Sequence, residues 1–197
     1  MDPNLLIGLI SFAFVTSITP GPNNLMLMAS GANFGFRRSL MHMLGINLGF
    51  LSLVLAAGMG LAALMIAVPQ AGVALKIAAV LYLLWLAWKI ARSAPPAAGS
   101  AAARPLTLGQ AALFQWVNPK AWAMALGAVS AYAGAGDMMA TALVALVFCL
   151  INLPCIATWV LAGEAMRRLL TNRNRLRVFN WTMATLLVLS LWPILKL

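Results

Sequence analysis

Acidic side chains are nearly absent from this sequence, which has three Asp and Glu residues against thirteen Lys and Arg residues. There are also only one histidine and two cysteines, so we find no cluster of metal ligands and no catalytic triad, and we expect no cofactor. Cys149 and Cys155 lie more than one helical turn apart in the same apolar stretch, so no disulfide is expected between them. Charged residues make up only 8% of the chain, against about 25% in a soluble domain.

Apolar residues are what the chain has in abundance. They account for 63% of it, and the mean hydropathy is +0.96, which indicates an integral membrane protein. A spanning helix needs roughly 17 to 25 apolar residues, and six stretches meet this length, at about residues 5–33, 40–68, 73–91, 110–132, 138–163 and 178–195. The first stretch follows Asp2 rather than a basic segment and has no clear cleavage site, so we expect a retained span and not a signal peptide.

Most basic residues follow the first, third and fifth of these stretches. They are Arg37, Arg38, Lys89, Arg92, Arg104, Arg167, Arg168, Arg173, Arg175 and Arg177. Because short cytoplasmic loops of membrane proteins are rich in Lys and Arg, this side is predicted to face the cytoplasm and both termini the outside. The net charge of +10 is then explained by anchoring to the lipid bilayer, and no nucleic-acid binding is expected.

A segment rich in Ala, Pro and Gly at residues 93–107 divides the chain into a first half, 1–92, and a second half, 108–197. With three spans each, the halves must enter the membrane from opposite sides. The sequence Ile46-Asn47-Leu48 recurs in the second half as Ile151-Asn152-Leu153. We therefore predict one all-α membrane domain of six transmembrane helices, arranged as a 3+3 inverted repeat with broken helices in spans 1 and 4.

The first span is interrupted near its middle by Thr19-Pro20-Gly21-Pro22-Asn23-Asn24. The prolines cannot donate backbone hydrogen bonds and their rings exclude the preceding turn, so the carbonyls just before them should be free. In hydrocarbon such a break is tolerated only against protein or a hydrated cavity. Asn23 and Asn24 are predicted to cap a second half-helix, whose N–H groups would point into the break and favour a carboxylate.

The fourth span is broken in the same way by Asn118-Pro119-Lys120. Asn118 suits an N-cap and Pro119 the first helical position. A lysine in mid-membrane costs about 3 kcal/mol on insertion scales, so Lys120 should face a cavity or an anion.

A zwitterion would fit both breaks, with its carboxylate near Asn23, Asn24 and Lys120 and its amine near the carbonyls before Pro20. An amino acid is thus the predicted ligand. The predicted substrate-binding residues are Thr19, Pro20, Gly21, Pro22, Asn23, Asn24, Asn118, Pro119 and Lys120, with Asn47 and Asn152 as cavity-lining candidates. In the alternative interpretation the breaks are packing kinks, Lys120 extends along Trp116 and Trp122 to an interface, and Asn47 and Asn152 only join helices.

These motifs, in this order, resemble the LysE/RhtB family of bacterial amino-acid exporters. The likeness extends over nearly the whole chain and includes residues 31–39, Leu44-Gly45, 75–93 and 110–120. Gly35-Phe36-Arg37 and the stretches 85–91 and 159–163 are most similar to the cysteine and O-acetylserine exporter branch. The resemblance implies efflux of small amino acids across the bacterial cytoplasmic membrane by a secondary transporter that is not an enzyme, with protons as the coupling ion.

The residues leave several points open. No acidic residue is placed to carry the coupling proton, and the lone His42 is interpreted as structural although an unperturbed histidine titrates near neutral pH. A passive small-solute channel is an alternative function, and a membrane thiol oxidoreductase is a weaker one, because both cysteines share one span. The oligomeric state is open, with a homodimer among the options.

Overall fold

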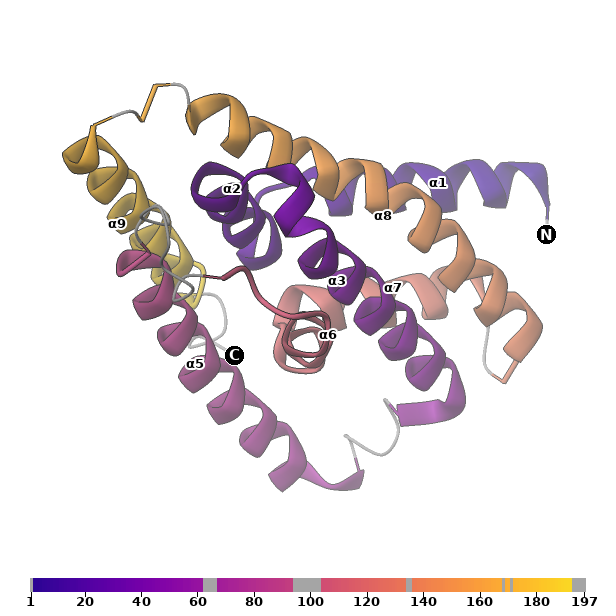
Figure 1. The fold of residues 1–197 in the computed structure, drawn as a ribbon. Coiled ribbons are helices and arrows are strands. Elements are labelled where there is room, and N and C mark those ends of the chain that lie inside the picture. Colours follow the sequence, from indigo (N-terminus) through magenta and orange to yellow (C-terminus); the bar gives the residue numbers. More distant parts are fainter. Residues whose placement is uncertain are drawn as a thin grey trace.

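A computed structural model describes residues 2–61, 67–93, 104–133, 136–167, 169–170 and 172–192 (Figure 1). In these residues all regular structure is helical. The elements are α1 (Pro3–Ile18), α2 (Pro22–Phe34), α3 (Phe36–Ala56), η1 (Ala57–Leu61), α5 (Pro69–Ala91), α6 (Leu108–Val117), α7 (Pro119–Tyr132), α8 (Met138–Arg167) and α9 (Arg173–Leu189). Each predicted span overlaps a helix or a broken pair. Residues 62–66 of the second span, 193–195 of the sixth and most of the predicted linker, 94–103, lie outside the described residues.

Three of these helical segments are long and apolar enough to cross a membrane: Phe36–Leu61, Gly72–Ala91 and Met138–Arg167. The pair α1 and α2 makes a fourth candidate, bent by 55° at its break. The pair α6 and α7, and α9, are not among the described helices that meet this length and hydropathy. By length and composition, the described helices therefore provide three or four candidate membrane spans. This count does not confirm the predicted six spans.

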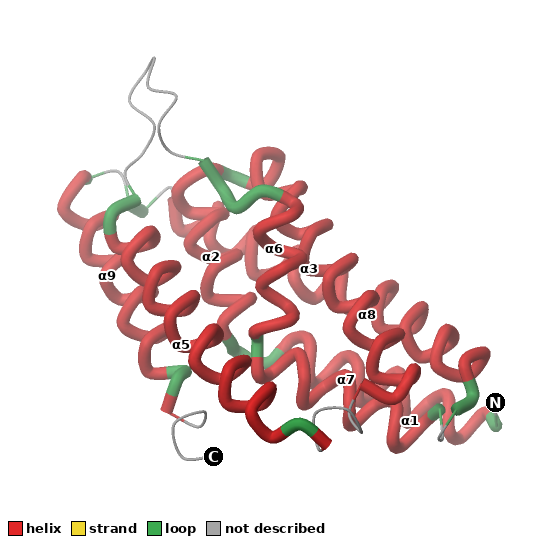
Figure 2. The backbone as a smooth tube through the Cα atoms, turned by 90° about the horizontal axis from the view of Figure 1, so that it is seen from below, coloured by secondary structure: helices red, strands yellow, loops and turns green. Residues whose placement is uncertain are grey.

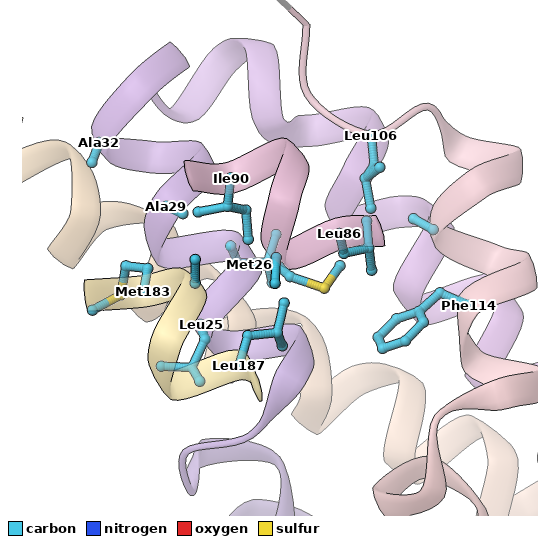
Figure 3. Packing of buried hydrophobic residues seen from close by; sticks show 14 of the residues in the cluster. Leu25, Met26, Ala29, Ala32, Leu86, Ile90, Leu106, Phe114, Met183 and Leu187 are labelled. Carbon is cyan, nitrogen blue, oxygen red and sulfur yellow. The ribbon is translucent and has the colours of Figure 1, made fainter. Parts of the chain in front are cut away.

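The helices are held together by two buried hydrophobic clusters. One joins α2, α5 and α9 with residues of α3, α6 and α8, and Figure 3 shows part of it, including Leu25, Met26, Leu86, Ile90, Met183 and Leu187. The other joins α1, α3, α7 and α8, with the Phe50 and Phe148 rings in tilted contact at a centroid distance of 5.1 Å. Each cluster includes residues from both predicted halves of the chain.

Glycines allow two of the helix pairs to come very close. A Cβ added to Gly31 of α2 would meet the Val160 carbonyl of α8, and one added to Gly163 of α8 would meet the Met28 carbonyl of α2. In the same way Gly45 and Gly49 of α3 lie against the backbone of α6. Small residues are typical of helix interfaces in membranes because they let backbones approach. Here these glycines fix the positions of α2 and α6, the helices that border the two breaks.

The outer surface of these helices is apolar. Leu81 of α5 is 63% exposed, Leu150 of α8 65% and Leu189 of α9 61%. Such faces would associate in water but are suited to lipid.

Most of the basic residues gather at one end of the molecule. In Figure 2 the junction of α2 and α3, the C-terminal end of α5 and the start of α9 lie at the same end, away from the N and C labels. Gly35 lies within reach of Glu164 and Arg167, and the Asn180 side chain donates to the Ser93 carbonyl at 2.8 Å. One charged end and an apolar body are what a membrane protein with a cytoplasmic basic side requires.

Candidate functional site

The first break separates α1, which ends at Ile18, from α2, which begins at Pro22. The carbonyls at the end of α1 are not free. Asn24 Nδ2 donates to the Ser17 and Thr19 carbonyls, at 2.8 Å each, and Trp159 Nε1 donates to the Ile18 carbonyl at 3.0 Å. The expectation of unoccupied carbonyls was wrong, because a carbonyl freed inside an apolar body takes the nearest donor.

The two asparagines do not cap α2 as predicted. Gly21 is the N-cap of this helix and makes no side-chain hydrogen bond there, so Asn23 and Asn24 lie in the first turn. Asn24 turns back to α1, whereas Asn23 faces α6. The first-turn N–H groups of α2 therefore keep the positive character of an uncapped helix end.

The second break follows the prediction closely. Helix α6 ends at Val117, Asn118 is the N-cap of α7, and Pro119 is its first residue. The Asn118 side chain accepts from the Lys120 N–H at 3.1 Å. This places Lys120 in the first turn of α7, next to a helix end whose dipole opposes a cation.

The two breaks meet through Lys120. Its ammonium donates to the Thr19 carbonyl at 2.7 Å, the Thr19 hydroxyl at 2.9 Å and the Pro20 carbonyl at 3.3 Å. A Cβ on Gly21 would come within 2.8 Å of Lys120 Cδ, so the absence of a side chain makes room for the lysine. The structure thus places the lysine at the first break and not beside Trp116 and Trp122.

Lys120 occupies the Thr19 carbonyl, one of the carbonyls before Pro20 that were predicted to receive the ammonium of a ligand. The three acidic residues lie elsewhere: Asp2 caps α1, Asp137 precedes α8, and Glu164 faces Gly35. The lysine charge is therefore balanced by carbonyl dipoles and a hydroxyl. A cation in a medium of low dielectric constant goes to the nearest strong acceptors, which explains the difference.

A pair of amides adds a second link between the breaks. Asn23 Nδ2 donates to Gln115 Oε1 at 2.8 Å, and Gln115 Nε2 donates back to Asn23 Oδ1 at 3.0 Å. The sequence argument did not single out Gln115, although it is a polar residue one turn before Asn118 in an apolar stretch. It is fully buried.

A cavity lies between the breaks, with room for little more than a water molecule. Of the predicted site residues, five line it: Gly21, Asn23, Asn24, Asn118 and Lys120. Thr19, Pro20, Pro22 and Pro119 shape the breaks behind this lining. Asn152 also lines the cavity and donates to Asn47 Oδ1 at 2.9 Å, so Asn47 supports the wall from behind.

Ser17 is a further lining residue that the sequence argument missed. Its side chain is 4% exposed, and its hydroxyl has no hydrogen-bond partner in the described structure. Buried polar atoms nearly always have a partner. An unpaired hydroxyl on the wall of a cavity lined by amides and an ammonium marks a place for a small polar ligand or a water.

The chain is similar to known proteins along almost its whole length. The family described as LysE type translocator matches residues 14–190. The cysteine/O-acetylserine efflux protein of Escherichia coli (strain K12) is 32% identical over 191 residues, 95% of this chain and 96% of the relative. That of Klebsiella pneumoniae subsp. pneumoniae is 30% identical over 190 residues, 95% of each chain.

No solved structure matches the chain. The family match nevertheless covers both breaks and every residue that lines the cavity between them. By this match and by the identity to curated relatives along almost its whole length, the chain belongs to the LysE type translocators, which are transporters and not enzymes.

Proposed function

We propose that this protein exports small neutral amino acids, of the cysteine and O-acetylserine type, from the bacterial cytoplasm by alternating access. The observation that carries the proposal is the meeting of two broken helices around a polar cavity, with Lys120 of one break bound to the other. The relatives named cysteine/O-acetylserine efflux proteins support the substrate class and the direction of transport.

The site offers complementary groups to both ends of an amino acid. Ser17, the amides and the uncapped first turn of α2 are donors for a carboxylate. The Thr19 and Pro20 carbonyls suit an ammonium group, and in this structure the Lys120 ammonium occupies them. When a substrate binds, its ammonium takes these carbonyls and Lys120 turns to its carboxylate.

This displacement also provides a reason for exchange. The cavity is too small for an amino acid as it stands, so the structure corresponds to a contracted state. The Lys120 ammonium and the substrate ammonium compete for the same carbonyls. In the empty carrier the lysine therefore takes the place of the substrate. We propose that the driving ion is the proton, as the family resemblance implies.

The helix contacts support two related halves. Helix α3 packs on α8, and α5 packs on α9. The first broken pair, α1 and α2, packs on α8, while the second pair, α6 and α7, packs on α3. Exchanging spans 1, 2 and 3 with spans 4, 5 and 6 leaves this pattern unchanged, which favours the six-span inverted repeat. It also explains why Asn47 and Asn152, from corresponding positions, bond to each other.

The test is counterflow in proteoliposomes loaded with O-acetylserine. The intact protein should drive uptake of labelled O-acetylserine, whereas Lys120→Ala should reduce it at least about tenfold, since a charge-assisted contact contributes about 1.5–3 kcal/mol. Lys76→Ala is the matched control, because Lys76 lies on α5 and does not line the cavity.

Normal counterflow by a folded Lys120→Ala protein would overturn the proposed site. Counterflow needs alternating exchange, so its absence in the intact protein, together with rapid efflux of the same solute, would indicate a channel.

A further inference from the structure

A second cavity lies at the basic end of the molecule, and the only histidine of the chain faces it. The His42 side chain is 2% exposed, and neither ring nitrogen has a hydrogen-bond partner in the described structure. Buried polar groups are nearly always paired with protein, water or ligand. The purely structural role expected for His42 does not account for two unpaired nitrogens on a cavity wall.

The other lining residues give the cavity a positive character. Met26, Leu86, Ile90 and Leu106, all labelled in Figure 3, form its apolar wall, and Lys89 and Arg104 supply two cations. Its remaining polar side chains are already engaged. Ser30 bonds to Ser39 at 2.7 Å, Asn33 bonds to Asn180 at 2.8 Å, and the Ser93 hydroxyl donates to the Lys89 carbonyl at 2.9 Å.

Among the described polar residues that line this cavity, only His42, Lys89 and Arg104 are thus left to bind a ligand. An imidazole can present an N–H, and both cations are donors without acceptor capacity, so the set is complementary to an anion. The Lys89 ammonium lies over the Trp85 ring, with Nζ 5.3 Å from the ring centroid, and its N–H groups have no hydrogen-bond acceptor in the described structure. No acidic residue lines this cavity in the described part of the chain.

The second cavity lies next to the central cavity along α2 and α3. On α3, His42 lies four residues before Ile46, which lines the central cavity, so the two are on one face and one turn apart. On α2, Met26 follows Asn23 by three residues in the same manner. The second cavity therefore lies between the basic end and the paired breaks.

We propose that this second cavity is a binding site for a free carboxylate, which receives the acid group of the amino acid on its way from the cytoplasm to the central cavity. His42 is the buried donor, and Lys89 and Arg104 supply the charge. The inference rests on the proposed function for the direction of travel. An anionic lipid headgroup would satisfy the same cations, but the apolar wall and the path toward the breaks favour a small free acid.

The experiment uses His42 as its own reporter. The full protein, purified through a tag without histidine and labelled at the histidine ring, gives a single imidazole signal by nuclear magnetic resonance. In discs of neutral lipid, acetate should shift this signal with saturation. Acetamide, its neutral isostere, and sodium chloride at equal ionic strength should not.

Charge variants locate the site. Lys89→Gln combined with Arg104→Gln should weaken the acetate titration about tenfold or more. Arg92→Gln is the matched control, because Arg92 is at the same end but lies over the Trp88 ring at 3.6 Å and does not line this cavity. Lys120→Ala should leave the acetate titration unchanged, since it alters only the central site.

Three results would overturn the inference: no saturable shift, which would mean that water alone occupies the cavity; an equal shift with acetamide or chloride; or a shift that requires phosphatidylglycerol in the discs. Transport separates this site from the proposed function. Counterflow of O-acetylserine without any acetate response would sink only the second site, whereas an acetate response without counterflow would sink only the export proposal.

Discussion

Amide side chains make many of the polar contacts within and between the two breaks. Asn24 satisfies the end of α1, Asn118 caps α7, and Asn23 pairs with Gln115. Amides carry donors and acceptors without charge, so they can replace missing backbone partners in an apolar body at a lower desolvation cost than ionic groups. Lys120 is the exception, and it is the one residue whose charge a substrate would have to displace.

The Asn23 and Gln115 pair gives a prediction at this scale. Gln115→Leu leaves the Asn23 amide without its partner and should lower the free energy of unfolding by about 1 kcal/mol. Asn23→Leu should act similarly. In the double variant both amides are absent, so the loss should be clearly smaller than the sum. Thermal unfolding in detergent measures all three; strictly additive losses would mean that the pair contributes no coupling.

At the scale of the helices, close packing through glycine fixes where the breaks lie. The reciprocal contacts of Gly31 and Gly163 hold α2 on α8, so the N-terminus of α2 cannot move without α8. Gly45 and Gly49 fix α6 on α3. Each broken pair is therefore attached to a long helix from the other end of the chain, α2 to α8 and α6 to α3, so a rigid-body motion would carry these helices together.

This packing predicts a marked contrast between glycines. Gly31→Ala and Gly163→Ala each place a methyl group against a carbonyl of the facing helix, so the helices must separate at a cost of about 1–3 kcal/mol in stability. Gly109→Ala is the control, because nothing lies within 4 Å of an added Cβ there and alanine favours the helix. If thermal unfolding showed equal melting temperatures for the three variants, the α2 and α8 contact would be incorrectly described.

Two local features of the site, the breaks and the Asn118 cap, could be predicted from sequence, whereas the cap of α2 was predicted wrongly and the long-range contacts were not predicted. The breaks and the Asn118 cap follow from residues at most a few positions apart, because proline and helix capping act locally. The partners of Asn23 and Lys120 lie 92 and 101 residues away. They depend on which helices become neighbours, and an acceptor-rich helix end attracts whichever donor that packing supplies.

For the whole molecule, the decisive property is orientation. Helix α8 has 30 residues and is about 45 Å long, more than the roughly 30 Å hydrocarbon core. A helix of this length can have its two ends on opposite sides of the membrane. The Arg167 end belongs with the other basic ends, so by the positive-inside rule we predict that it is cytoplasmic and that the Met138 end is outside.

Cysteine labelling tests this orientation in intact cells. In a Cys149→Ala, Cys155→Ala protein that still exports, Met139→Cys should react with a membrane-impermeant thiol reagent added outside, since Met139 is 82% exposed. Arg167→Cys should react only after permeabilisation, and the cysteine-free parent is the control for background. Reaction of both from one side would mean that α8 does not cross the membrane. The reverse pattern would place the His42 cavity outside, where it could not receive a carboxylate from the cytoplasm.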